Sequence, residues 1–139
     1  MALWHVGSRH ITQLLLWRTG PDRFRVMQAG TPADFLTNYD YILFDRKYEG
    51  VLRSAGTQLQ LTPVTVTDKL KGQVWDNYLE AQIRHIASGD EITGATPSGP
   101  AIYYMGENNV FVSDTLKQAL QQVTGQKLEF SLGLSLFAA

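Results

Sequence analysis

Residues Val110–Phe130 read VFVSDTLKQALQQVTGQKLEF and predict a strand, a capped helix, a stop and a second strand. The segment starts with β-formers. Ser113 then provides a hydroxyl that can accept a hydrogen bond from an unpaired amide of the first helical turn. Apolar residues recur at helical spacing, so one helix face must pack against the rest of the protein. Gly125 is a suitable stop, because glycine adopts the left-handed conformation without steric cost. The apolar stripe consists of Leu116, Ala119, Leu120 and Val123.

A second stretch, Ile42–Leu61, repeats this order as ILFDRKYEGVLRSAGTQLQL. Asp45 occupies the place of Ser113, and Gly56 occupies the place of Gly125. The repeat arises either from an internal duplication or because every strand–helix–strand unit combines the same two periodicities. Both explanations predict an α+β fold with a mixed, mainly antiparallel sheet on which two strand–helix–strand units pack their helices.

The length of 139 residues fits one domain. Hydrophobic residues make up 44% and charged residues 18%, which is typical of a globular chain that buries a core. Along the chain we expect an N-terminal strand and hairpin region at 1–40, unit one at 41–67, a middle segment and loop at 68–100, and unit two at 101–139.

Composition also limits the function. The net charge of −1 argues against general binding to a nucleic-acid backbone. The chain has no cysteine, which excludes disulfides, thiol catalysis and cysteine metal sites. Its longest N-terminal apolar run, Leu14–Trp17, is far too short to span a membrane. We therefore expect a cytoplasmic protein that binds neither nucleic acid nor membrane.

The N-terminal region leaves two alternatives open. Residues 3–17 fit a strand followed by a helix capped by Ser8, and they also fit a strand through Ile11–Trp17. Leu14–Trp17 and Phe24–Met27 flank a turn, and together they predict a hairpin.

The middle segment is ambiguous. Residues 73–87, QVWDNYLEAQIRHIA, fit a helix and a strand, and their helix-forming residues favour the helix. Residues Gly89–Pro100 are predicted to form a long loop, a type of segment that is often functional. A strand at Ala101–Met105 is expected to form a hairpin with the strand that begins at Val110.

Sequence motifs for catalysis are missing, including the nucleophile elbow, the zinc-protease helix and the phosphate-binding loop. The histidines match no metal-site spacing, and nothing holds two of the carboxylates at a catalytic separation. We therefore expect no catalytic residue, no cofactor and no metal. The histidines are His5, His10 and His85, and the carboxylates are Asp76, Glu80, Asp90 and Glu91.

Aromatic and charged residues are frequent in the sequence around the long loop. Tryptophan, tyrosine and arginine are the residues that most often anchor protein interfaces. The predicted partner-binding residues are Trp75, Asp76, Tyr78, Arg84, Asp90, Glu91 and Tyr104.

The segment VFVSDTLKQAL at 110–120, followed by Gly125 and Phe130, resembles the C-terminal signature of a family of bacterial polymorphic-toxin immunity proteins. The stretch Leu61–Val64 is similar to the end of an earlier copy of this signature, and Tyr78–Ile86 is similar to a tyrosine-containing extended stretch. The resemblance implies that 73–87 is a strand. It also implies a non-enzymatic cytoplasmic protein that neutralises a cognate toxin, and it assigns no contact residues.

Two other functions remain open from the sequence. One is a small hydrolase or transferase whose site lies near the loop at 89–100, with His85, Asp90 and Ser98 as the residues to suspect. The other is an accessory module of a phage or secretion particle. A homodimer is compatible with each of these functions.

Overall fold

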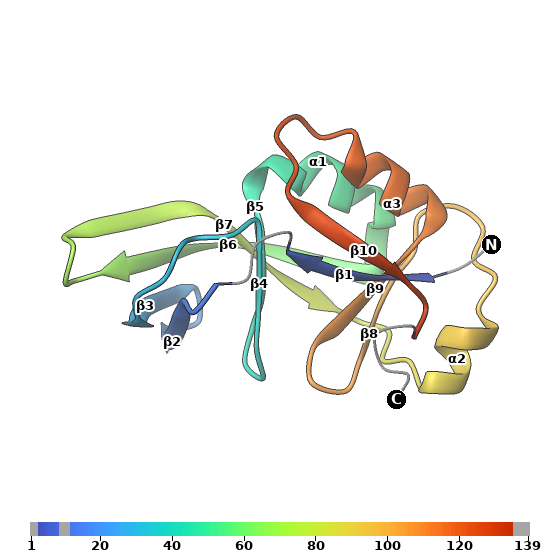
Figure 1. Ribbon diagram of the computed structural model, residues 1–139, viewed down its shortest axis with the longest axis horizontal. Helices are drawn as coiled ribbons and strands as arrows, with labels where there is room; N and C mark the ends of the chain where they lie inside the picture. Colours follow the sequence, from blue (N-terminus) through green and yellow to red (C-terminus); the bar gives the residue numbers. More distant parts are fainter. Residues whose placement is uncertain (1–2, 9–11, 135–139) are drawn as a thin grey trace.

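The computed structural model describes residues 3–8 and 12–134, which form ten strands in two sheets together with a few short helices (Figure 1). Nearly all neighbouring strands are antiparallel. The predicted α+β class is therefore confirmed. The expectation of one sheet shared by both units is wrong, because each unit has a sheet of its own.

The four-stranded sheet has the order β10–β1–β9–β8. Its strands are β1 (Leu3–Ser8), β8 (Ile102–Met105), β9 (Asn109–Ser113) and β10 (Leu128–Leu132), and helix α3 (Asp114–Gln121) connects β9 to β10. Strand β1 lies between β9 and β10 and is antiparallel to both. The two strands of unit two therefore run parallel to each other, separated by β1.

The six-stranded sheet has the order β2–β3–β6–β7–β5–β4. Its strands are β2 (Leu15–Gly20), β3 (Arg23–Gln28), β4 (Phe35–Thr37), β5 (Ile42–Asp45), β6 (Leu59–Asp68) and β7 (Gln73–Ile83). The link from β5 to β6 consists of the 3-10 segment η1 (Arg46–Tyr48), helix α1 (Glu49–Leu52) and the 3-10 segment η2 (Arg53–Gln58). The β6–β7 hairpin extends away from the helices at the left of Figure 1.

The two units share one topology. Strand β7 lies between β5 and β6, as β1 lies between β9 and β10. Strands β4 and β8 form the corresponding antiparallel hairpins with β5 and β9. The N-terminal strand thus takes the place in unit two that β7 takes in unit one. The repeat seen in the sequence therefore extends to the strand order.

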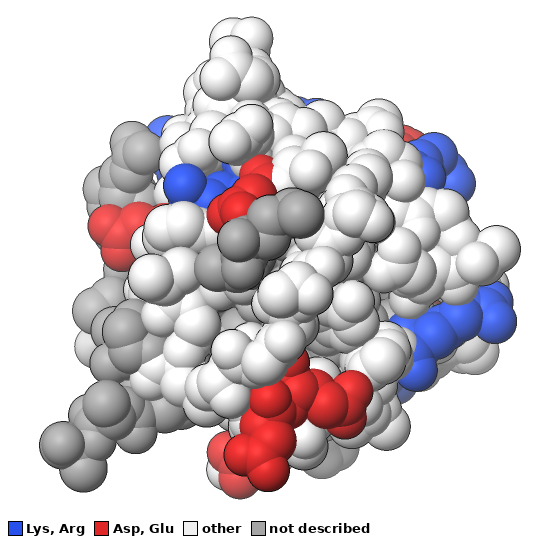
Figure 2. Space-filling model, turned by 90° about the vertical axis from the view of Figure 1, so that its right-hand side faces the viewer, with Lys and Arg blue, Asp and Glu red and all other residues white. Residues whose placement is uncertain are grey.

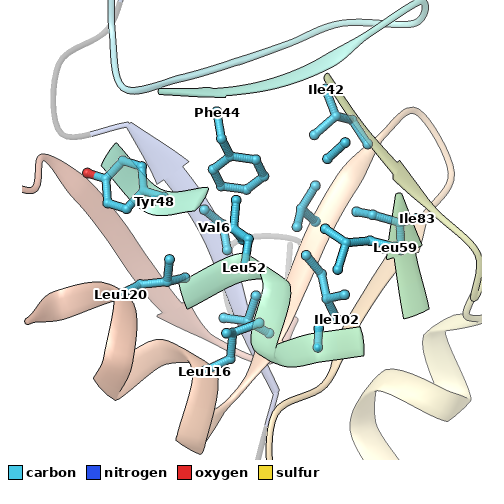
Figure 3. Close-up of a cluster of buried hydrophobic side chains, with 14 of the residues drawn as sticks. Val6, Ile42, Phe44, Tyr48, Leu52, Leu59, Ile83, Ile102, Leu116 and Leu120 are labelled. Atoms are coloured by element: carbon cyan, nitrogen blue, oxygen red, sulfur yellow. The ribbon is translucent and has the colours of Figure 1, made fainter. Parts of the chain in front are cut away.

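Both predicted caps are present. The Ser113 hydroxyl accepts a hydrogen bond from the Leu116 amide at 3.3 Å, and the Asp45 carboxylate accepts one from the Lys47 amide at 2.9 Å. The apolar stripes of both helical segments are buried in one core between the sheets, as Figure 3 shows. Its labelled members are Val6, Ile42, Phe44, Tyr48, Leu52, Leu59, Ile83, Ile102, Leu116 and Leu120.

The local preference for a helix at 73–87 is wrong, because Gln73–Ile83 is the long strand β7. The strand implied by the family resemblance is the observed structure. Four consecutive residues of β7, numbers 78–81, are buried. The strand is central in its sheet, and a second core, which includes Tyr78, packs on it. Burial on both faces removes the alternation by which a strand is recognised.

The β2–β3 hairpin is confirmed, with Trp17 opposite Arg25. The alternative helix capped by Ser8 is wrong, since Leu15 belongs to strand β2. Two residues of that segment, His10 and Ile11, lie outside the described residues. The predicted loop at 89–100 starts with a short helix, α2 (Gly89–Gly94).

Candidate protein-binding site

The most exposed aromatic and basic groups on a sheet lie on one face of the six-stranded sheet, across β2, β3, β6 and β7. Its central row contains Trp17, Arg25, Thr67 and Val74, which are direct cross-strand neighbours. Strand alternation turns the intervening residues Leu16, Phe24 and Val66 into the second core. We call this surface the outer sheet face, consisting of Leu15, Trp17, Arg23, Arg25, Met27, Thr65, Thr67, Lys69 and Val74.

Apolar groups on this face are unusually exposed for a folded domain. Trp17 is 59% exposed and Val74 is 65% exposed, and Leu15 and Met27 at the other end of the hairpin are also exposed. Arg25 and Thr67 lie between Trp17 and Val74 in the cross-strand row, and exposed apolar surface bordered by polar residues is typical of interaction sites. Tryptophan and arginine are both enriched among the residues that contribute most to binding at protein interfaces.

The charge of the outer sheet face is positive. Arg23, Arg25 and Lys69 line a hollow of about 510 Å³ together with Thr65 and other residues of the four strands. The Asp22 carboxylate is 4.0 Å from the Arg23 guanidinium. Within residues 3–8 and 12–134, Arg25 and Lys69 form no ion pair. Two cations are therefore available to an acidic partner.

Arg18 connects β2 to neighbouring parts of the sheet. Its Nη2 donates to Oε2 of Glu80 at 2.5 Å, and its Nε donates to Oδ2 of Asp40 at 3.2 Å. The guanidinium also lies over the ring of Phe24, 4.6 Å from its centroid. The hydrogen bond to Glu80 is the main cause of the raised pKa of Arg18. Because Glu80 belongs to β7 and Asp40 precedes β5, this cluster holds β2 in place and makes the outer sheet face a preformed surface.

A second surface lies at the opposite end of β7, around α2. His85 Nε2 is 3.0 Å from Glu91 Oε2, and the imidazole packs edge-on against Tyr103 with 4.5 Å between ring centroids. The hydrogen bond with His85 lowers the pKa of Glu91. Figure 2 faces this side of the molecule and shows acidic side chains gathered at its lower edge. Asp90 and Glu91 in the first turn of α2 give this end a charge opposite to that of the outer sheet face.

The predicted partner-binding residues do not form one surface. Trp75 and Asp76 lie on the extended β6–β7 hairpin, whereas Arg84 follows the other end of β7. A strand rises about 3.3 Å per residue, which separates Trp75 from Arg84 by roughly 30 Å. Asp90, Glu91 and Tyr104 lie with Arg84 at the acidic end.

Tyr78 has to be removed from the predicted set. Its side chain is 1% exposed, and its hydroxyl donates to the carbonyl of Ala33 at 2.8 Å. Burial raises the pKa of Tyr78. The residue is a core tyrosine with a satisfied hydroxyl, and it cannot contact a partner while the protein is folded.

Sequence reasoning missed Trp17 as an exposed anchor. The signal was present in β3, where Arg23 and Arg25 alternate with Phe24 and place the arginines on the solvent face. A bulge between Arg18 and Gly20 shifts the pairing, so Trp17 faces Arg25 and shares its side of the sheet. Bulges are set by local strand geometry and have no clear sequence pattern here.

The residues suspected of hydrolysis are not arranged as a relay. His85 is bonded to Glu91 and not to Asp90, and the hollow beside it is lined by Asp90, Glu91 and Tyr103 but not by Ser98. In the described part of the chain, no hydrogen bond joins Ser98 to His85.

No protein-family model, curated protein or solved structure matches this chain. Among the described residues, no group of three histidine or carboxylate side chains is arranged to hold a metal ion. The described helices are all too short or too polar to cross a membrane.

Proposed function

We propose that this protein is an immunity protein, which binds a cognate bacterial toxin through the outer sheet face and keeps it inactive in the cytoplasm. The observation that carries the binding role is the exposed Trp17–Arg25 pair, which lies on β2 and β3 of the four-strand surface. The assignment of the partner as a toxin rests on the resemblance of residues 110–130 to the immunity-protein signature. Binding alone accounts for neutralisation, so the proposal needs no catalytic residue, cofactor or metal.

A protein partner fits the surface better than a nucleic acid does. The outer sheet face combines two arginines and a lysine with exposed apolar side chains, whereas the whole chain has a net charge of −1. Nucleic-acid binding relies chiefly on neutralising many phosphates. A protein with an acidic, partly apolar surface would pair with Arg25 and Lys69 and cover Trp17 and Val74.

Rigidity supports tight binding by such a surface. Residues that are already ordered before association lose little entropy when the complex forms. Arg18, Glu80 and Asp40 order the hairpin in the free protein, so the cost of arranging Trp17 and Arg25 is met during folding.

The experiment is co-expression in bacteria with the products of the neighbouring genes, scored by growth rescue and co-purification. Trp17→Ala is expected to weaken binding by about 2 kcal/mol or more, which is roughly thirtyfold in Kd. Tyr39→Ala is the matched control, because Tyr39 is 81% exposed but lies outside the outer sheet face. Arg25→Ala and Arg84→Ala form a second matched pair of exposed arginines, one on the face and one at the acidic end.

The possible outcomes test the immunity function and the location of the binding surface separately. If no neighbouring product is toxic and rescued, the immunity function is wrong. If rescue occurs but Arg84→Ala weakens the complex more than Trp17→Ala does, the toxin binds the acidic end and the outer sheet face is wrong. Competition by added oligonucleotide would instead indicate a nucleic-acid ligand.

A further inference from the structure

Strand edges are potential pairing sites, because each presents unpaired N–H and C=O groups. Three of the four sheet edges in the described part of the chain are covered. At β8, the amide of Ala87 donates to the carbonyl of Tyr104 at 2.8 Å. At β4, which has three residues, the Ser8 hydroxyl donates to the carbonyl of Phe35 at 2.7 Å.

The edge of β2 is covered by side chains. The amide of Leu16 donates to the Tyr41 hydroxyl at 3.2 Å, and Arg18 binds Asp40 beside it. The remaining edge is that of β10, which lies at the end of the four-stranded sheet. After β10 the chain turns away, and Leu134 packs beside α2 in a small third core.

The register of β10 defines which of its groups are available. The amide of Gly133 donates to the carbonyl of Leu3 at 2.8 Å, and the same register pairs Ser131 with His5 and Glu129 with Gly7. In an antiparallel ladder, the residues between these pairs direct both peptide groups away from the partner strand. The outward residues are Leu128, Phe130 and Leu132.

Of these outward peptide groups, Gln126 pairs only with the amide of Leu128. Its side-chain oxygen accepts from the amide of Leu128 at 2.9 Å. The peptide groups of Phe130 and Leu132 face outward beyond it, and the Leu132 side chain is 52% exposed. Strand β10 has no proline, lysine or bulge of the kind that protects natural sheet edges.

The repeated topology indicates that this edge accepts a further strand. Strand β6 is the counterpart of β10 in unit one, and its outer edge is occupied by β3 through three residue pairs. The equivalent side of β10 has no strand in the described part of the chain. The fold therefore tolerates a neighbour at this position.

We infer that β10 pairs with β10 of a second copy of this chain, antiparallel and centred on Phe130, to form a homodimer with a continuous eight-stranded sheet. In this register Phe130 faces its symmetry mate, Leu128 faces Leu132, and Glu129 faces Ser131. The apolar residues of both copies share one sheet face, and no like charges are opposed. The outward peptide groups of Phe130 bond reciprocally across the two-fold axis.

The strand of one copy thus matches itself in polarity, charge and hydrogen bonding. This self-complementarity favours a second copy over an unrelated strand. The dimer involves the edge of the four-stranded sheet, whereas the proposed toxin site is on the six-stranded sheet. The two associations are therefore independent, and dimerisation can be measured with no toxin present.

The test is sedimentation equilibrium of the full chain over a wide concentration range. The native protein is expected to be a dimer. Ser131→Glu places a carboxylate opposite Glu129 of the other copy at two symmetric positions, and it should raise the dimer Kd by about tenfold. Adding Glu129→Lys to this variant places an ammonium group opposite each introduced carboxylate and should restore the dimer. Restoration also shows that the variant chains fold.

A native chain that is monomeric at every concentration up to its solubility limit would overturn the inference. A dimer that is equally stable in the native protein, the S131E variant and the E129K/S131E variant would also overturn it. If the native chain is monomeric but S131E weakens a toxin complex, the edge binds a strand of the partner protein instead of a second copy.

Discussion

Asp34 joins the two units of the fold, and its replacement should have a large effect on stability. This buried residue precedes β4, and three donors converge on its Oδ2. They are the Tyr48 hydroxyl, Lys47 Nζ at 2.9 Å and the backbone amide of Lys127 at 2.9 Å. Tyr48 and Lys47 belong to unit one, whereas Lys127 immediately precedes β10 of unit two.

The structure allows the cost of two substitutions to be estimated. In Asp34→Asn, the amide oxygen can take the place of Oδ2, but the bonds lose their charge. Hydrogen bonds to charged groups contribute about 1 kcal/mol more than neutral ones, which applies fully to the donors Tyr48 and Lys127. The partly exposed Lys47 pair adds less than about 1 kcal/mol. We expect Asp34→Asn to lower the free energy of unfolding by about 2–3 kcal/mol.

Asp34→Ala should cost more, about 3–5 kcal/mol, because it leaves the fully buried Tyr48 hydroxyl without its acceptor. Tyr48→Phe removes that hydroxyl and keeps the ring in the core. The double variant Asp34→Ala/Tyr48→Phe should therefore be less destabilised than the sum of Asp34→Ala and Tyr48→Phe, with a coupling free energy of about 1–2 kcal/mol. Equilibrium urea unfolding of the native protein, Asp34→Asn, Asp34→Ala, Tyr48→Phe and the Asp34→Ala/Tyr48→Phe double variant measures these free energies. Strictly additive effects would refute the reasoning.

The same carboxylate predicts a pH dependence. Burial acts to raise the pKa of Asp34, but hydrogen bonds from Tyr48 and Lys47 outweigh it and hold this pKa below its usual value. The folded pKa is thus below the unfolded value of about 3.9. The stabilisation is fully present above the unfolded pKa and is lost as the pH falls through the folded pKa.

The stability difference between the native protein and Asp34→Asn should therefore be constant from about pH 7 to pH 5 and should shrink below about pH 4. A difference that persists unchanged into strong acid would show that the charge of Asp34 contributes nothing.

Three further substitutions test close packing and the Arg18–Glu80 cluster beneath the outer sheet face. Gly30→Ala should destabilise the protein by more than about 2 kcal/mol, because the new Cβ would lie 2.2 Å from the backbone nitrogen of Leu14. Gly50→Ala, in α1 with open space around it, should instead stabilise by about 0.5–1 kcal/mol; urea midpoints in the reverse order would contradict both. Glu80→Ala should cost about 2–4 kcal/mol and accelerate amide exchange in β2, since it leaves Arg18 without its buried partner. Unchanged exchange in β2 would show that the hairpin does not depend on this ion pair.

The correctly predicted elements are those whose signals are local. The caps at Ser113 and Asp45 and the helical stripes depend on residues within a few positions of one another, and the structure confirms them. The helix α2 was also locally encoded, because Ser88 and Glu91 form a capping box. The glycines around it favoured a loop, so this signal was overlooked.

The elements that were missed depend on distant contacts. Strand β7 contains good helix formers, but β5 and β6 pair with it on both sides and its local preference is overridden. An N-terminal strand was expected, but the partners of β1 were not, because they lie more than a hundred positions away in the sequence. The candidate site was missed for the same reason. A register shift in the hairpin places Trp17 opposite Arg25, and a second core covers Tyr78.

The segment that determines the fold is therefore not the surface that we propose acts on a partner. The stripe of α3, with Leu116 and Leu120 fully buried, contributes to the core, so its conservative replacement changes stability before it changes binding. Trp17 and Arg25 are in contrast exposed, so their replacement removes little packing and should change binding before it changes stability. Two related chains could thus share the 110–130 pattern and differ completely in the outer sheet face. On this reasoning, the pattern identifies a scaffold, and under the proposed function the choice of toxin is determined by a few exposed side chains on β2 and β3.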